Sequence, residues 1–293
     1  AAPYETRVVP VIADIRDEHR ITAVFESWCP EVVFHAAAHK HVPLMELNSI
    51  EAVTNNVGGT LRVVRAAERA GVSNFVLVST DKAVNPANIM GATKLLAEAI
   101  VRDMAARSSG AFVVVRFGNV LASRGSVVPT FLRQLEMGGP VTVTDPRMTR
   151  YFMGPLEAVS LILQAAALTE GGDIFVLDMG EEVRIVDLAK RLIRLRGLRV
   201  GEDVEITYTG TRPGEKLYEK LVEVPYERQR PTAAPYIFKV QGAQQISRGG
   251  LLAEVDALAA LAREGKREDI RARLHAGMAT SYDFNGVPQE GLR

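Results

Sequence analysis

The residues best suited to acid–base chemistry lie together between positions 79 and 94. Thr80, Asp81 and Lys82 directly follow an apolar run at 74–78 that is typical of a buried strand. Met90 and Lys94 stand one helical turn apart at the start of a helical pattern. Because open α/β sheets bind ligands at the carboxyl ends of their strands, a hydroxyl, a carboxylate and two amines would meet there. This pattern predicts an acid–base site.

The polar residues allow two other interpretations. Asp81 and Lys82 could form a solvated turn closed by Asn85 and Pro86. The position after a strand and the helical spacing of Met90 and Lys94 argue against that turn. A second set, His35, His39 and His41, could suggest a metal site, but no carboxylate has helical spacing with these histidines, so no metal is predicted.

The elements that would hold the site alternate between strand and helix. An apolar, β-branched stretch at 7–13 opens the chain, and strands are expected at 31–34, 75–79 and 111–117. Helical periodicity marks 16–28, 48–70 and 91–107. This order predicts an α/β fold with a doubly wound, parallel, Rossmann-like sheet.

After Gly125 the spacing changes and indicates a smaller α/β lobe. Short strands are expected at 140–143, 174–178 and 204–208, and helices at 156–168 and 186–196. Two amphipathic helices, 251–263 and 267–275, follow in the tail. The predicted domains are therefore a partial nucleotide-binding domain at 1–125, a substrate lobe that takes up most of 126–224 and a helical extension at 225–293.

Composition excludes several classes of function. Lys plus Arg and Asp plus Glu each number 35, so no excess charge points to nucleic acid. The apolar runs are too short for a transmembrane segment. The single cysteine, Cys29, rules out an intrachain disulfide and favours a reducing, cytoplasmic compartment.

A glycine-rich phosphate loop is absent from the sequence. Dinucleotide sites of this fold begin with a strand, Gly-x-Gly-x-x-Gly and a helix, and that spacing occurs nowhere in the 293 residues. Either the first strands of the sheet are missing and the chain is a fragment of a longer one, or the fold binds no dinucleotide. The first interpretation is favoured, and it predicts an incomplete sheet with apolar surface exposed on its N-terminal side.

Eight motifs in order resemble the nucleotide-sugar 4,6-dehydratases of bacterial polysaccharide biosynthesis, in the extended short-chain dehydrogenase/reductase superfamily. They are Ala13-Asp14-Ile15-Arg16-Asp17, the segment from His35 to Glu46, Asn55-Asn56-Val57, Ser79 to Lys94, Arg116-Phe117-Gly118-Asn119-Val120, Gly125-Ser126-Val127-Val128-Pro129, Thr149-Arg150-Tyr151-Phe152-Met153 and Arg212-Pro213-Gly214-Glu215-Lys216. Within that family the sequence is most similar to UDP-N-acetylglucosamine 4,6-dehydratases.

The resemblance implies a lyase that uses NAD rather than NADP and forms a UDP-4-keto-6-deoxy sugar. It implies a homo-oligomer that binds a UDP-sugar, and a longer parent chain with a membrane region at the cytoplasmic face of the inner membrane. Asp81 would be the acid at the C6 hydroxyl, Lys82 the base at C5 and Thr80 the hydrogen-bond partner of the developing oxyanion. Lys94 would bind the nicotinamide ribose.

Position 90 departs from the superfamily pattern. The superfamily has Tyr four residues before the lysine, whereas Met90 stands here, as in some members of the dehydratase family. A thioether cannot exchange a proton, so the base for the C4 hydroxyl is left open between Asp81 and a water molecule.

The resemblance also assigns contacts to cofactor and substrate. Asp14 would contact adenine, with a helix N-cap as its alternative role, and the guanidinium of Arg212 would bind the diphosphate, with a helix start as the alternative. The cofactor set is Asp14, Ile15, Ala36, Ala37, Ala38, Lys40, Asn56, Ser79, Lys94 and Phe117. The substrate set is Lys40, His41, Pro43, Asn119, Ser126, Val127, Arg150, Arg212 and Glu215.

The sequence is also compatible with two other functions. A nucleotide-sugar 4-epimerase of the same superfamily would need Tyr at position 90 and has no need for Asp81 and Lys82. A non-catalytic fragment or binding-only relative is supported by the missing glycine loop, and retention of NAD through gel filtration would distinguish it from an enzyme.

Overall fold

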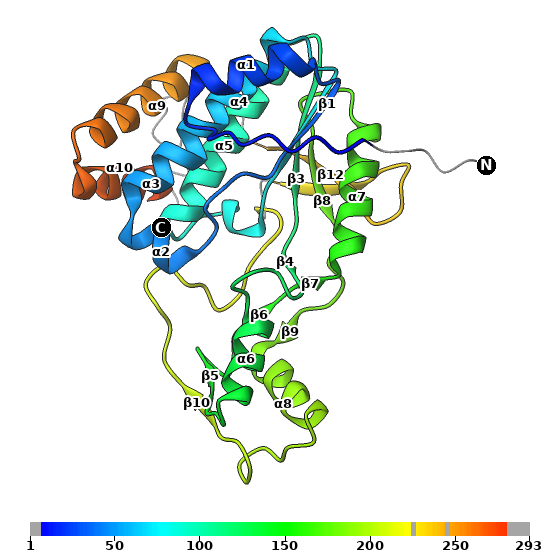
Figure 1. Ribbon diagram of the computed structural model, residues 1–293, viewed down its shortest axis with the longest axis vertical. Coiled ribbons are helices and arrows are strands. Elements are labelled where there is room, and N and C mark those ends of the chain that lie inside the picture. The colour runs from blue at the N-terminus through cyan, green and yellow to red at the C-terminus, as the bar shows by residue number, and fades with distance from the viewer. Residues whose placement is uncertain (1–6, 224–226, 244–246, 280–293) are drawn as a thin grey trace.

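The computed structural model describes residues 7–223, 227–243 and 247–279. Figure 1 shows a larger body of sheet and helices and a smaller lobe that extends from one end of it. The last part of the predicted extension, 280–293, lies outside the described residues.

The body is organised around one six-stranded sheet. Its strands, in spatial order, are β1 (Val32–His35), β2 (Asn74–Val78), β3 (Ala111–Arg116), β8 (Ile174–Leu177), β12 (Ile237–Gln241) and β11 (Arg228–Pro231). The first four run parallel to one another, whereas β12 and β11 pair antiparallel. The predicted α/β fold with a parallel, Rossmann-like sheet is thus confirmed, and two antiparallel strands extend the sheet at its C-terminal edge.

Side chains alternate between the two faces of the sheet, as strand geometry requires. Phe75, Leu77, Phe112 and Val114 face one apolar core together with helices α1 (Glu18–Trp28), α4 (Thr60–Arg69) and α5 (Ile89–Ala105). Helices α9 (Arg248–Arg263) and α10 (Arg267–Ala279) belong to the same core. The other face packs against α7 (Pro155–Leu168). Such double burial explains the continuous apolar runs of β2 and β3.

The N-terminal side of the sheet is open. The stretch 7–13 forms no strand, contrary to the strand/helix alternation read from its sequence, and Val8 and Ile12 are 82% and 94% exposed. β1 is the outermost strand, and its Val32 and Phe34 are 45% and 42% exposed. A β-branched stretch needs a partner strand to satisfy its backbone, and none pairs with 7–13 among the described residues. The predicted incomplete sheet is confirmed.

The predicted helix at 48–70 is divided in the structure. It comprises α3 (Ser49–Ala52), a π-helical segment, η1 (Val53–Gly59), and α4, preceded by a short helix that was not predicted, α2 (Val42–Leu47). A π-helical turn shifts the side-chain period, which an apolar pattern alone does not reveal. These bulges are frequent at functional sites.

The smaller lobe has its own apolar core. It contains α6 (Val127–Glu136), β5 (Val141–Val143), α8 (Ile185–Leu195) and β10 (Ile206–Tyr208), which pack around Phe131, Val141 and Ile193. Two small pairings lie outside the main sheet: β4 (Asn119–Val120) with β7 (Phe152–Met153), and β6 (Thr149–Arg150) with β9 (Val183–Arg184).

The predicted boundaries at 125 and 224 cut across the main sheet. β8 comes from the segment predicted for the substrate lobe, and β11 and β12 come from the predicted helical extension, yet all three strands belong to the main sheet. The chain therefore leaves the body after β3, builds part of the lobe and returns twice.

Candidate active site

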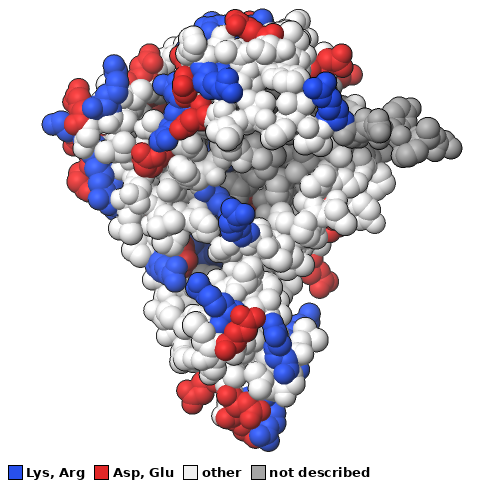
Figure 2. Space-filling model, in the orientation of Figure 1, with Lys and Arg blue, Asp and Glu red and all other residues white. Residues whose placement is uncertain are grey.

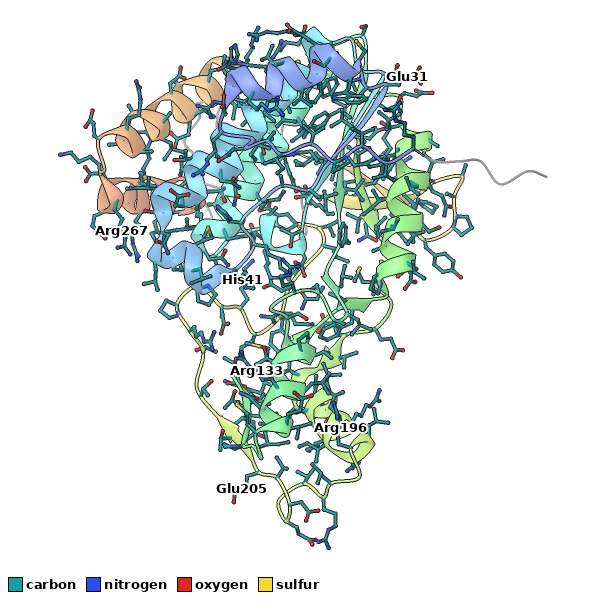
Figure 3. All side chains as sticks on the ribbon, viewed as in Figure 1. Glu31, His41, Arg133, Arg196, Glu205 and Arg267 are labelled. Atoms are coloured by element: carbon teal, nitrogen blue, oxygen red, sulfur yellow. The ribbon has the colours of Figure 1, made fainter. Side chains whose placement is uncertain are left out.

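A cavity of about 530 Å³ lies between the carboxyl ends of the parallel strands and the smaller lobe. Figure 3 shows His41, one of its lining residues, where the body meets the lobe that carries Arg133 and Arg196. Most predicted residues line this cavity: Ala36, Ala38, Lys40, His41, Pro43, Ser79, Thr80, Lys82, Met90, Lys94, Phe117, Asn119, Ser126, Val127, Arg150, Arg212 and Glu215. Five others, Asp14, Ile15, Ala37, Asn56 and Asp81, are not among its lining residues.

Asp81 and Lys82 form an ion pair at the end of β2. Lys82 Nζ lies 2.9 Å from Asp81 Oδ1 and 3.2 Å from Asn119 Oδ1. Thr80 donates its hydroxyl to the same Asp81 oxygen at 2.8 Å. Asp81 is fully buried, and its Oδ2 has no hydrogen-bond partner among the described residues. Asp81 thus does not line the cavity itself but is hydrogen-bonded to Thr80 and Lys82, which do.

Local structure explains this arrangement. Thr80 caps the short 3₁₀ helix η2 (Asp81–Ala83), and the Asp81 N–H donates to the Phe117 carbonyl at 3.1 Å. Asn88 caps α5 by accepting from the Gly91 N–H at 2.7 Å, and its side-chain amide donates to the Gly214 carbonyl at 2.9 Å. The loop that carries the ion pair is therefore held by the residue that follows β3, by α5 and by the segment that follows β10.

Lys94 is buried beneath the cavity wall. Its Nζ donates to the Val78 carbonyl at 2.8 Å, which ties α5 to the last residue of β2. Burial lowers the pKa of Lys94 to about 8, and the nearby Glu98 opposes this shift. Met90, one turn earlier, is 2% exposed and lines the cavity.

A buried ionic network supports Ser79. Its hydroxyl donates to Glu98 Oε1 at 2.5 Å, and Glu98 is paired with Arg116 at 2.7 Å. Arg116 also pairs with Glu227 at 2.8 Å. The hydroxyl of Ser79 is thus engaged inside the protein, so this residue would offer a ligand little beyond its backbone.

The loop after β1 is fixed by Asn56. Its side chain accepts from the His39 N–H at 2.8 Å and donates to the His39 carbonyl at 3.0 Å and to the Thr93 hydroxyl at 3.1 Å. These bonds use its amide within the protein, so in the structure Asn56 braces the wall of the cavity. Lys40, on that loop, donates to the Ser123 hydroxyl at 3.2 Å, and both residues line the cavity.

Asp14 is a partly exposed carboxylate held by Arg16. Arg16 contacts both carboxylate oxygens, with a shortest distance of 2.7 Å, and these hydrogen bonds lower the pKa of Asp14 to about 2. Asp17, not Asp14, caps α1 by accepting from the Arg20 N–H. The N-cap interpretation of Asp14 is therefore wrong. Ile15 packs against Gly59 of η1, where a Cβ would lie 2.5 Å from its Cδ1.

The three histidines do not converge. His35 is buried, bonds to the Thr60 hydroxyl at 2.9 Å and has its pKa lowered to about 3 by burial and by the charge of Lys94. Within the described ranges, no group of three or more His, Cys, Asp or Glu side chains could hold a metal ion.

The segment after β10 forms the remaining wall. Arg150 donates to the carbonyls of Thr149, Leu217 and Lys216. Arg212 is exposed, and its backbone N–H donates to Glu215 Oε2 at 3.2 Å. Glu219, which the sequence did not single out, lines the cavity and is only 4% exposed. No local pattern in the sequence marks Glu219, because the segment that carries it forms turns rather than a helix.

The comparisons with known proteins place the chain in a family. Residues 2–241 match the model described as "Polysaccharide biosynthesis protein". The chain belongs to this family. It is 59% identical over 222 residues to "Capsular polysaccharide biosynthesis protein CapD" of Staphylococcus aureus. The matched residues cover 75% of this chain and 37% of that relative. The chain thus spans little more than a third of that relative's length, and the family resemblance of the sequence is confirmed.

Solved structures share the fold. Pen from Bacillus thuringiensis is 36% identical, with a TM-score of 0.72, over 80% of this chain and 72% of that one. The UDP-glucose 4-epimerase of Thermus thermophilus, in complex with NAD, has a TM-score of 0.64 at 22% identity over 73% of this chain and 75% of that one. Within the described part of this chain, no helix is both long and apolar enough to cross a membrane.

Proposed function

We propose that this chain carries the reaction centre of an NAD-dependent UDP-N-acetylglucosamine 4,6-dehydratase that acts in the cytoplasm. The observation that carries the proposal is the Asp81–Lys82 ion pair at the cavity, 2.9 Å between Nζ and Oδ1, next to Met90 in place of a tyrosine. Dehydration needs both a base and an acid near adjacent carbons, which such a pair supplies.

The residues present suit the nicotinamide half of the cofactor. Ala36 and Ala38 line the cavity beside β1 with small side chains. Lys94 uses one of its three N–H donors for the Val78 carbonyl, so two donors remain for a ligand. When bound, NAD would accept the hydride from sugar C4 and return it to C6. No glycine-rich loop occurs in this sequence, so the proposal assigns no residue to the cofactor diphosphate.

Lys82 is proposed to take the C5 proton. The Lys82 side chain lies on the cavity wall, while Asp81 lies behind it and behind Thr80. Transfer of one proton within the ion pair, from Lys82 Nζ to Asp81, would give the neutral amine that acts as base and the protonated carboxyl that acts as acid. Asp81 would then pass this proton to the Thr80 oxygen as that hydroxyl gives its own proton to the leaving C6 oxygen. The C5–H electrons form the C5–C6 double bond, the C6–O bond breaks and water leaves. Thr80 and Asp81 thus act together as the acid.

A 4-epimerase is the second candidate, because the NAD-bound structure of the same fold is a UDP-glucose 4-epimerase. The two reactions differ in mass balance, since dehydration removes one water and epimerisation leaves the mass unchanged. The full-length protein should be incubated with UDP-N-acetylglucosamine and NAD, and the mass of the product measured by mass spectrometry. A product of unchanged mass would contradict the dehydratase proposal.

Variants test the assigned pair in the same assay. Asp81→Asn and Lys82→Ala should each lower turnover about 10²- to 10⁴-fold, the usual contribution of a general acid or base, with UDP affinity retained. Asp203→Asn removes a carboxylate from an exposed pair with Arg199 in the smaller lobe and serves as the control. Turnover near the parent rate in either test variant would remove that residue from the mechanism.

A further inference from the structure

Asn88 lies at the cavity between α5 and the wall segment, which comprises residues 212–219 and carries Arg212. Asn88 is 2% exposed, and both ends of its side-chain amide are engaged. Its Oδ1 accepts from the Gly91 N–H at 2.7 Å, and its Nδ2 donates to the Gly214 carbonyl at 2.9 Å. One side chain thus joins the first turn of α5 to the wall segment, close to Arg212.

The backbone at Gly214 is shaped for this bond. Gly214 has a φ of +78°, a left-handed conformation that glycine adopts without strain. A Cβ at this position would lie 2.7 Å from Asn88 Cβ and 3.4 Å from the Ala87 carbonyl oxygen. Real Cβ atoms do not approach another Cβ that closely, so the wall segment can reach Asn88 only because residue 214 has no side chain.

Arg212 is connected to Gly214 through a closed turn. The Glu215 N–H donates to the Arg212 carbonyl at 3.0 Å, and the Arg212 N–H donates to Glu215 Oε2 at 3.2 Å. The guanidinium of Arg212 has no hydrogen bond or ion pair to any other described residue. The position of this guanidinium is therefore set by the backbone of the turn at 212–215.

Other side chains hold the wall segment beyond this turn. Lys216 donates to the Val84 and Asn85 carbonyls, at 3.0 and 2.5 Å, and Arg150 donates to the Leu217 carbonyl at 3.1 Å. Within the described part of the chain, the bond from Asn88 to Gly214 is the one hydrogen bond that ties the turn at 212–215 to the rest of the molecule.

We propose that Asn88 is a positioning residue for the diphosphate of the UDP-sugar, because its Nδ2 holds the turn at 212–215, and with it Arg212, at the cavity. The proposal rests on the substrate of the function proposed above and on Arg212 as the ligand of its diphosphate. A guanidinium makes paired bonds to phosphate oxygens only when its planar fork is correctly placed. The Oδ1 of Asn88 has the separate task of capping α5, so mutation can separate the two roles.

Asn88→Ser separates them, because serine is an equally good N-cap but is too short to reach the Gly214 carbonyl. Ser247→Asn makes the reverse exchange at the N-cap of α9 and is the matched control. The first readout needs no ligand: it is the amide hydrogen exchange of the peptide that covers 212–217 in the full-length protein. Exchange should be about two- to tenfold faster in Asn88→Ser, the factor that corresponds to one lost hydrogen bond, and unchanged in Ser247→Asn.

The second readout is UDP affinity by calorimetry. Asn88→Ser should weaken UDP binding about two- to tenfold, with NAD affinity unchanged. In an Arg212→Ala background the same change should have no further effect, because Asn88 would act through the guanidinium that this background lacks. Additive losses in the double variant would overturn the proposal, since a general disturbance of the cavity would then carry the effect.

Unchanged hydrogen exchange of 212–217 in Asn88→Ser would also overturn the proposal, whatever the UDP affinity. A parent protein that binds UDP but forms no dehydrated product would overturn the proposed reaction, and the two readouts would still decide the role of Asn88. A parent protein that does not bind UDP would overturn both.

Discussion

A Cβ atom on Gly91 would lie 2.3 Å from the carbonyl oxygen of Lys82. Real Cβ atoms do not approach backbone oxygens that closely, so only glycine lets the first turn of α5 pack against the loop of the ion pair. The same turn is fixed by the bond from the Gly91 N–H to Asn88 Oδ1. The short distance between the Asp81–Lys82 pair and the Met90–Lys94 pair thus depends on Gly91 having no side chain.

Gly91→Ala should therefore separate α5 from this loop. Overpacking of this kind costs about 1–3 kcal/mol, and we expect a loss of that size in the free energy of unfolding, together with reduced turnover. Denaturant unfolding and a turnover assay on the same samples measure both effects. Gly249→Ala in α9 is the control, because its added Cβ meets nothing within 4 Å beyond its chain neighbours and the backbone of its own helix, and alanine favours a helix. Equal unfolding midpoints for Gly91→Ala and the parent would show that the loop yields without cost.

The buried Lys94 should make stability depend on pH in a defined direction. Its pKa is about 8 in the folded protein and 10.5 as a model value, so between these values the unfolded chain binds the proton that the folded one has lost. Stability contributed by this group therefore rises with pH across that window. Below it both states are charged, and the cost of the buried charge, up to about 3 kcal/mol, is fully present.

Lys94→Met removes this charge. As the pH is raised from 7 to 10.5, the parent loses its buried charge and its free energy of unfolding gains up to roughly 3 kcal/mol, whereas the variant has no such charge to lose. The free energy of unfolding of the variant minus that of the parent should therefore fall by the same amount over this range. Urea unfolding at several pH values measures the difference. The exposed Lys220→Met is the control, for which the difference should stay constant. A constant difference for Lys94→Met as well would mean that Lys94 is not desolvated in the folded protein.

The sequence predicted the elements that carry the chemistry because their signals are local. The apolar run before Ser79 marked β2, and the spacing of Met90 and Lys94 marked α5, which begins at Ile89 rather than at Gly91. β2 is buried on both of its faces, and α5 is buried along most of its length. The polar residues between them therefore fell at the cavity, as a strand followed by a helix requires.

Features that depend on distant pairing were not predicted. β11 and β12 join the sheet through β8, more than 50 residues earlier in the chain, and no local pattern specifies that partner. Glu219 was missed for the same reason, since its burial is created by Arg150 and by the packing of the wall segment onto the body. Charge balance was predictable from composition, and Figure 2 shows acidic and basic side chains interspersed over the visible face.

Arg212 provides a test of the substrate diphosphate site. It is exposed on the cavity wall, and a guanidinium can make paired, charge-assisted bonds to phosphate oxygens. Arg212→Lys keeps the charge and loses the planar fork, so UDP affinity should fall while NAD affinity is unchanged. Calorimetric titration with each ligand measures the two affinities. Arg228→Lys, an exposed arginine on β11, is the control, and equal UDP affinity in Arg212→Lys and the parent would remove Arg212 from the site.

Met90 lines the cavity at the position where the superfamily carries a tyrosine, and its side chain is nearly fully buried. A thioether contributes packing and no proton transfer, and leucine has nearly the same volume. Met90→Leu should therefore keep most activity and leave the shape of the pH–rate profile unchanged. Turnover of UDP-N-acetylglucosamine by the full-length variant across pH measures both. A loss of more than about a hundredfold, roughly 2.7 kcal/mol of barrier, would show that the sulfur has a specific role in the reaction.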